Sequence, residues 1–192
     1  MAGNELTLRW VFPSAEHRRD IRSFHIYHEQ GNQASAVHLY KVCVEDILNN
    51  FSDTYFDSQF QHISTGTPNS VTTFHRWNAA TSVWELAGEI AWTSDANATI
   101  HFGATSVHIQ DLRRRKKASS KSRRFRADGS EYKWKIADNN SDLFCVDSRG
   151  KIVATWIHQT QILKVERRVE GILDRLVITC LLHVWFRLSN RW

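Results

Sequence analysis

Residues 113–126, with the sequence RRRKKASSKSRRFR, are the part of the chain best suited to chemistry with an anion. They hold nine basic side chains and no acidic one, whereas the whole protein has a formal net charge of +5. The rest of the chain is therefore net negative, and the basic pI of about 9.3 is a local property. Clustered Lys and Arg side chains neutralise the phosphates of nucleic acids or anionic lipids, and they also act as nuclear import signals.

We expect eight of these side chains to bind an anionic surface, and phospholipid is the surface we favour. They are Arg113, Arg114, Arg115, Lys116, Lys117, Lys121, Arg123 and Arg124. Near an acidic membrane, each engaged Lys or Arg contributes roughly 1 kcal/mol. Three other interpretations stay open: a solvated, mobile loop, a nucleic-acid or import contact, and a contact with a protein partner. Ser119, Ser120 and Ser122 lie in the same run, where phosphorylation would cancel much of the charge.

Metal and thiol chemistry are not indicated by the other reactive residue types. The chain has 10 His but neither an HExxH motif nor paired CxxC motifs, so we predict no metal and no cofactor. Cys43, Cys145 and Cys180 are widely spaced within apolar patterns. They are typical of reduced core thiols in an intracellular protein, and a nucleophilic cysteine is the alternative.

Hydrolase and nucleotide-binding motifs of the GxSxG, P-loop and GxGxxG types are missing. The sequence therefore favours a non-enzymatic binding protein over an enzyme with an unfamiliar pocket. Tryptophan is abundant, with eight in the chain, and five lie in expected strands: Trp77, Trp84, Trp92, Trp134 and Trp156. Their apolar alternation favours core positions, whereas exposed Trp would stack on sugars or bases and indicate a nucleic-acid or carbohydrate-binding protein.

Residues 171–188 (GILDRLVITCLLHVWFRL) are the most apolar stretch and predict a helix around which the chain is organised. Its apolar residues cover most of the circumference and leave a narrow polar stripe of Arg175, Thr179, His183 and Arg187. Such a helix needs protein or lipid on nearly every side. The charges at Asp174 and Arg175 favour a protein core over a membrane span. We expect Asp174 to be a structural residue at the helix start, paired with Arg168 or Arg175, and His183 to be buried with a partner.

Short segments of period-two alternation fill the rest of the chain and predict eleven or twelve strands. The expected strands lie near residues 6–12, 24–26, 37–44, 71–77, 83–92, 99–102, 107–109, 132–136, 143–146, 152–157 and 162–165. Trp84, Leu86, Gly88, Ile90 and Trp92 are expected on one face. Residues 45–62 fit neither period and predict a short helix or loop. The fold class is mainly β with one C-terminal helix, and a closed barrel of about twelve strands would bury that helix.

Several segments between residues 73 and 187 resemble a fungal domain family of unknown function. The likeness rests on Glu89-Ile-Ala-Trp92, residues 125–134 (FRADGSEYKW), Asp147-Ser-Arg-Gly150, Ile152-Val-Ala154 and Gly171-Ile-Leu-Asp174. That family is similar to the tubby-like group, which includes the plant LURP-one-related proteins and the phospholipid scramblases. The resemblance implies a closed twelve-stranded barrel around a C-terminal hydrophobic helix, and it carries no catalytic residues with it.

Composition sets the expected domain organisation and location. Pro and Gly are scarce, with 2 and 8 residues, so we expect residues 1–192 to form one domain. The first residues carry charge and lack an apolar region, which predicts no secretory signal. We expect a cytoplasmic protein without a transmembrane span, associated with a membrane or nuclear if the basic run acts there. The sequence gives no oligomeric state.

Overall fold

The structure is a computed structural model that describes residues 4–12, 23–29, 36–46, 70–94, 96–117 and 119–192. Its strands are β1 (Glu5–Val11), β2 (Phe24–Glu29), β3 (Ala36–Asp46), β4 (Ser70–Asn78), β5 (Val83–Ser94), β6 (Asn97–Phe102), β7 (Thr105–His108), β8 (Arg123–Ala127), β9 (Ser130–Ile136), β10 (Leu143–Val146), β11 (Ile152–Ile157) and β12 (Ile162–Glu166). Its helices are the 3₁₀ helices η1 (Asp111–Arg113) and η2 (Arg167–Ile172) and the α-helix α1 (Leu173–Leu188). The helix or loop expected over residues 45–62 lies outside the described residues from residue 47 onward.

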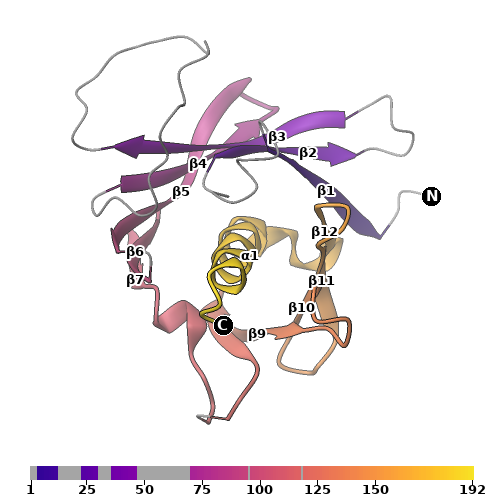
Figure 1. The fold of residues 1–192 in the computed structure, drawn as a ribbon. Coiled ribbons are helices and arrows are strands. Elements are labelled where there is room, and N and C mark those ends of the chain that lie inside the picture. The colour runs from indigo at the N-terminus through magenta and orange to yellow at the C-terminus, as the bar shows by residue number, and fades with distance from the viewer. Residues whose placement is uncertain (1–3, 13–22, 30–35, 47–69, 95, 118) are drawn as a thin grey trace.

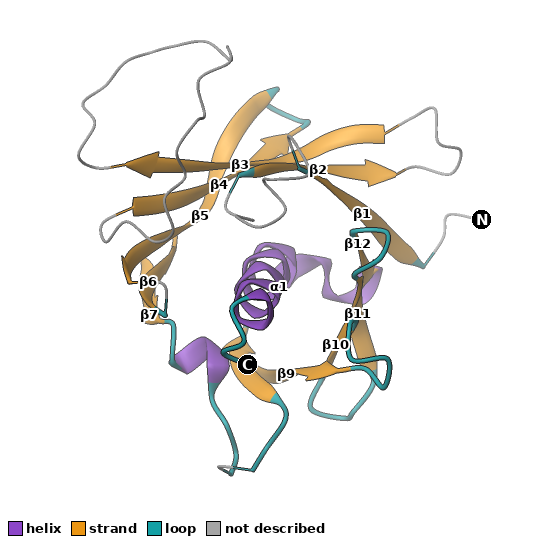
Figure 2. Cartoon of the chain, viewed as in Figure 1, coloured by secondary structure: helices purple, strands orange, loops and turns teal. Residues whose placement is uncertain are grey.

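The strands of the described residues form one antiparallel sheet in the order β7-β6-β5-β4-β3-β2-β1-β12-β11-β10-β9-β8. Pairing of β1 with β12, with Leu8 opposite Leu163, joins the two halves. The sheet curves around α1, which Figures 1 and 2 show inside the ring of strands. The mainly β class and the helix after the strands are thus confirmed.

The expected closed barrel is wrong, because β7 and β8 are edges of the sheet and do not pair with each other. After β7 the chain turns into η1, and the edge of β8 is met by one isolated bridge between Arg114 and Arg124. The Arg114 N–H donates to the Arg124 carbonyl at 3.1 Å, and the Arg124 N–H donates to the Arg114 carbonyl at 2.9 Å. The chain leaving η1 therefore takes the place that β7 would need. We call the region beside this bridge, residues 111–113, 122–124 and 189–192, the seam.

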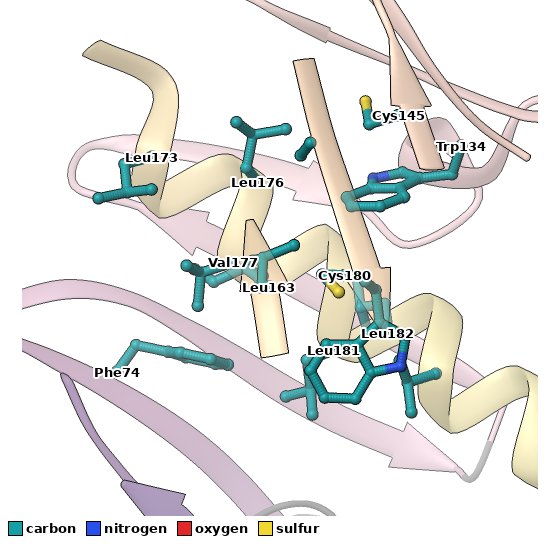
Figure 3. Close-up of a cluster of buried hydrophobic side chains, with 14 of the residues drawn as sticks. Phe74, Trp134, Cys145, Leu163, Leu173, Leu176, Val177, Cys180, Leu181 and Leu182 are labelled. Carbon is teal, nitrogen blue, oxygen red and sulfur yellow. The ribbon is translucent and has the colours of Figure 1, made fainter. Parts of the chain in front are cut away.

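Helix α1 lies at the centre of the core. All of residues 176–184 are buried, including Thr179 and His183 of the polar stripe. Figure 3 shows side chains of α1 between residues of opposite parts of the sheet, with Phe74 on one side and Trp134 on the other. The Trp134 indole N–H donates to Thr179 Oγ1 at 3.0 Å, which satisfies both polar groups. A helix enclosed in this way explains why its sequence is apolar nearly all round.

Strand β5 contacts α1 at Gly88. Beside this residue, the alternation of inward-facing and outward-facing residues shifts by one. A Cβ atom at Gly88 would lie 2.7 Å from Ile178 Cδ1 and 2.9 Å from the His101 carbonyl, so only glycine fits without movement. Next to it Ala87 forms a bulge, because Phe74 is opposite Gly88 and His75 is opposite Leu86. One extra residue exchanges the two faces of a strand.

This bulge makes the expected shared face of β5 wrong. Ile90 and Trp92 are buried with Gly88, whereas Trp84 and Leu86 are 36% and 53% exposed on the other face.

Candidate functional site

The loop between η1 and β8 carries most of the expected anion-binding side chains. It projects away from α1 in Figure 1, below the sheet. We call residues 114–117 and 119–121 the basic hairpin. Five of the eight expected residues lie here with exposed side chains: Arg114, Arg115, Lys116, Lys117 and Lys121. The hairpin therefore presents its charge to solvent, as an anion-binding surface requires.

The other three expected residues are placed differently: Arg113 lies in η1, and Arg123 and Arg124 lie in strand β8 and not in a loop. Arg123, Phe125 and Ala127 are buried and alternate with Arg124 and Arg126. This alternation was missed in the sequence because an arginine occupies an inward position. Outside the core, Arg124 forms an ion pair with Glu131 of the neighbouring strand β9, which neutralises it.

Arg113 turns from η1 toward α1 and the residues that follow it. Its guanidinium group lies over the Phe186 ring, 3.4 Å from the centroid, and its Nη2 donates to the Arg191 carbonyl at 2.7 Å. Its Nε has no hydrogen-bond partner among the residues that the structure describes. Burial, with the charges of Arg123 and Arg115, lowers the pKa of Arg113 to about 10.

Arg123 is the most deeply buried arginine of the described residues, with 3% of its surface exposed. Its Nη1 donates to the carbonyls of Ser120 and Ser122 at 3.1 and 3.3 Å. Its guanidinium also lies 5.2 Å from the Trp192 ring, and the Trp192 indole N–H donates to the Lys121 carbonyl at 2.9 Å. Burial and the charge of Arg115 lower the pKa of Arg123. The residues after α1 thus cover this arginine.

His183, which was expected to have a partner, lies beside the seam without one. It is fully buried, and neither ring nitrogen forms a hydrogen bond in the described structure. Its ring packs against Trp192 and Trp134, with centroids 5.2 and 6.1 Å away. Burial, and then the charges of Arg113 and Arg123, hold the pKa of His183 well below its usual value, so the imidazole is neutral at pH 7.

Asp174 lies in the first turn of α1, as expected, but with other partners than expected. Its Oδ1 accepts a hydrogen bond from the Tyr40 hydroxyl and lies 3.4 Å from Arg76 Nη1. Burial and the Asp174 charge raise the pKa of Tyr40 well above its usual value, so the phenol stays protonated as a donor. These contacts tie the start of α1 to β3 and β4, which is a structural role.

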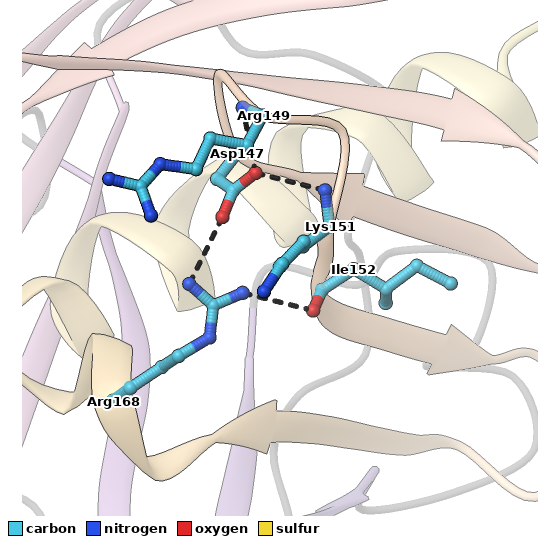
Figure 4. Close-up of polar contacts among 5 residues, drawn as sticks. All are labelled: Asp147, Arg149, Lys151, Ile152 and Arg168. Atoms are coloured by element: carbon cyan, nitrogen blue, oxygen red, sulfur yellow. Dashed lines mark hydrogen bonds and ion pairs between the residues drawn. The ribbon is translucent and has the colours of Figure 1, made fainter.

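The two arginines expected near Asp174 contact other residues instead. Arg175 lies over the Phe102 ring, 4.3 Å from its centroid. Arg168 Nη1 donates to Asp147 Oδ2 at 3.0 Å, in the turn between β10 and β11 (Figure 4). Asp147 Oδ1 also accepts the N–H groups of Arg149 and Lys151, each at 2.9 Å.

The acidic partner at this turn is charged under ordinary conditions. Burial alone would raise the pKa of Asp147, but the Lys151 and Arg149 N–H groups and the Arg168 guanidinium together lower it. The segment Asp147-Ser-Arg-Gly150, which carried part of the family resemblance, is therefore a structural turn.

A second surface feature is an aromatic patch on the outer face of β2 to β5, the face turned away from α1. It consists of His25, Tyr27, His38, Trp77 and Trp84. Tyr27 stacks on His38 at 4.8 Å, His38 meets Trp84 edge-on at 4.7 Å, and Trp84 lies 5.4 Å from Trp77. Of the five tryptophans expected in strands, Trp92, Trp134 and Trp156 are buried in the core, whereas Trp77 and Trp84 are not.

A hollow of about 360 Å³ in the described residues is lined by Arg9, Tyr27, Glu29 and Ala36, which are not the clustered carboxylates and histidines of many enzymes. Another hollow of about 230 Å³ lies where α1 ends, lined by Asn140, Ser141, Leu143, Trp156, His158, Val184, Arg187 and Leu188. In the same described part, no three His, Cys, Asp or Glu side chains are close enough to hold a metal ion. Cys145 and Cys180 are buried free thiols whose pKa is raised mainly by burial, while Cys43 is partly buried. The helices of the described residues include none that is long and apolar enough to cross a bilayer.

The model of a family of unknown function, DUF6593, matches residues 47–187, which agrees with the resemblance to a domain family without known activity. No curated protein and no solved structure matches the chain.

Proposed function

Because the chain belongs to DUF6593, a family of unknown function, its membership brings no activity, and we propose its function from geometry. We propose that it is a non-enzymatic binding module that engages an anionic phospholipid surface through the basic hairpin. The exposure of five basic side chains on one projecting loop carries this proposal. The resemblance of the family to the tubby-like group, which includes phospholipid scramblases, points the same way.

The expected affinity is modest and sensitive to salt. Five engaged charges at roughly 1 kcal/mol each give about 5 kcal/mol, which corresponds to a dissociation constant in the range of about 0.1 to 1 mM. Exposed charges are screened over about 10 Å at 0.1 M salt, so binding weakens as salt rises. Such a contact is a reversible association with a membrane surface.

Co-sedimentation with vesicles tests this proposal. The unmodified protein should sediment with vesicles that contain phosphatidylserine and stay in solution with phosphatidylcholine alone. The triple variant Lys116→Gln, Lys117→Gln, Lys121→Gln should lose most of this binding at unchanged stability. A matched control, Arg149→Gln, Lys151→Gln, Lys164→Gln, removes the same charge far from the hairpin and should keep binding. Equal sedimentation with both lipids, or equal loss in both variants, would end the proposal.

A second candidate function, recognition of a ring compound such as a sugar or a base, is favoured by the aromatic patch. Trp84 is 36% exposed and lies in a row of rings, which is the arrangement on which sugars and bases stack. Titration with oligosaccharides and with single-stranded oligonucleotides should then change tryptophan fluorescence, and Trp84→Ala should abolish the change. An unchanged spectrum with every probe would remove this candidate.

A further inference from the structure

The seam holds two inward-facing arginines whose charge is not balanced within the described residues. Neither Arg113 nor Arg123 forms an ion pair with an acidic side chain there. Among the described residues, their hydrogen bonds go to neutral carbonyls, those of Arg191, Ser120 and Ser122. Burying a charge without a counter-charge costs several kcal/mol in a protein, so such a pair is unfavourable without an anion.

Unused hydrogen-bonding capacity lies at the same place. Within the part of the chain that the structure describes, Arg113 Nε has no hydrogen-bond partner, and both nitrogens of the fully buried His183 have none. The three groups are near one another, since Arg113 donates to the carbonyl of Arg191, next to Trp192, and the charges of Arg113 and Arg123 both lower the pKa of His183. Trp192 links the cluster, because its ring lies against both His183 and Arg123.

Part of this cluster reaches the surface on the side of the hairpin. Arg113 is partly buried. Arg115, whose charge lowers the pKa of both Arg113 and Arg123, is exposed. A compact anion with several acceptor oxygens satisfies more than one guanidinium at once, and phosphate has this form.

We infer that the seam binds a phosphate group, held by the guanidinium groups of Arg113 and Arg123 with His183 next to them. This inference rests on the proposed function, in that it names the chemical group that an anionic surface would offer. It assigns a different role to each part of the basic segment. The hairpin supplies long-range attraction, whereas the seam recognises one phosphate.

Thermal unfolding in inorganic phosphate, compared with chloride at the same ionic strength and pH, tests the site. Phosphate at about twentyfold above its dissociation constant should raise the midpoint by about 5 °C. Arg113→Gln and Arg123→Gln should each weaken phosphate binding about tenfold or more, whereas Arg126→Gln, on the exposed side of β8, should not. If Arg123→Gln does not fold, Arg113→Gln decides. Equal midpoints in phosphate and chloride, or wild-type affinity in Arg113→Gln, would overturn the inference.

The hairpin variant separates this inference from the proposed function. Lys116→Gln, Lys117→Gln, Lys121→Gln should lose vesicle binding and keep its response to inorganic phosphate. Phosphate binding without any vesicle binding would leave the seam site standing and remove the lipid function. A response to phosphate that disappears in the hairpin variant would count against the seam.

Vesicles also show where the phosphate comes from. Phosphatidic acid exposes a phosphomonoester, and phosphatidylserine does not. Stronger binding to phosphatidic acid at equal membrane charge, lost in Arg113→Gln, would identify the ligand as a lipid headgroup. Equal binding to both lipids, together with an intact response to inorganic phosphate, would identify a soluble phosphate compound.

Discussion

Two arginine sites in different parts of the sheet differ in whether an acidic side chain pairs with the arginine. At the turn between β10 and β11, Arg168 pairs with Asp147 at 3.0 Å and also lies 3.4 Å from the Ile152 carbonyl (Figure 4). At the seam, Arg123 is far more deeply buried and yet has only carbonyl partners in the described structure. The more exposed arginine thus has the counter-charge, and the buried one does not.

This difference indicates which site serves folding and which serves binding. A charge that is paired inside the chain is satisfied and needs nothing from outside. A buried charge without a pair makes the folded state less stable until an anion arrives, and binding to the folded state then adds stability. The turn is therefore expected to tolerate no loss of its carboxylate, while the seam is expected to tolerate loss of its charge.

The largest expected effect on stability comes from removing the paired carboxylate at the turn between β10 and β11. Asp147→Ala removes the acceptor of two N–H groups and the partner of Arg168, and it should lower the free energy of unfolding by about 2 kcal/mol. Arg168→Gln removes only the exposed partner and should cost less than about 1 kcal/mol. Urea unfolding measures both. A loss below about 0.5 kcal/mol in Asp147→Ala would show that the turn is not held by this carboxylate.

A pH dependence of intermediate size is expected from His183 at the seam. Its pKa is near 6.5 when unfolded and well below that when folded, because of burial and the charges of Arg113 and Arg123. The unfolded chain therefore binds more protons below pH 6.5. His183 supports stability above pH 6.5, and this support is lost as pH falls toward the folded pKa, by at most about 1.4 kcal/mol per pH unit.

The variant His183→Leu isolates this contribution. Between pH 6.5 and pH 5 its free energy of unfolding should fall less steeply than that of the unmodified protein. His25 and His38 also have lowered pKa values, mainly through burial, but they contribute equally to both proteins. Parallel pH profiles would mean that His183 is protonated equally in both states.

The smallest expected effect on stability is that of removing the unpaired charge. Arg123→Met keeps an unbranched apolar stem and removes the guanidinium from a positive environment. Its free energy of unfolding, without phosphate, should stay within about 1 kcal/mol of the unmodified protein, because replacing a poorly compensated buried charge by an apolar group is often neutral or stabilising. A loss of more than about 2 kcal/mol would place Arg123 with Arg168 as a structural residue.

Most strands and the helix were predictable from the sequence, because each depends on a local pattern of apolar residues. Closure of the sheet was not, since it depends on whether β7 or the chain after η1 meets the edge of β8. The bulge at Ala87 also cannot be recognised from the alternation of apolar residues, so the face expected for Trp84 was wrong. Both errors concern which segments meet across the sheet, which a local pattern does not contain.

The basic residues of the candidate site were predictable from the sequence, but the direction in which their side chains point was not. Nine basic residues in one segment predict an anion-binding surface, yet nothing in their order says that Arg113 turns inward. The partner of Asp174 was equally hidden, because Tyr40 lies 134 residues away. An arginine two residues before Phe125 and four before Ala127 was a usable sign of strand β8, had it been included in the alternation.

The most direct test of the contrast between the two sites is a titration of isotope-labelled protein with inorganic phosphate, followed by backbone amide NMR. The seam account predicts chemical-shift changes at residues 113–124, 183 and 191–192, with little change at Asp147, Lys151 and Arg168. Shifts of equal size at both arginine sites, or none at the seam, would contradict it.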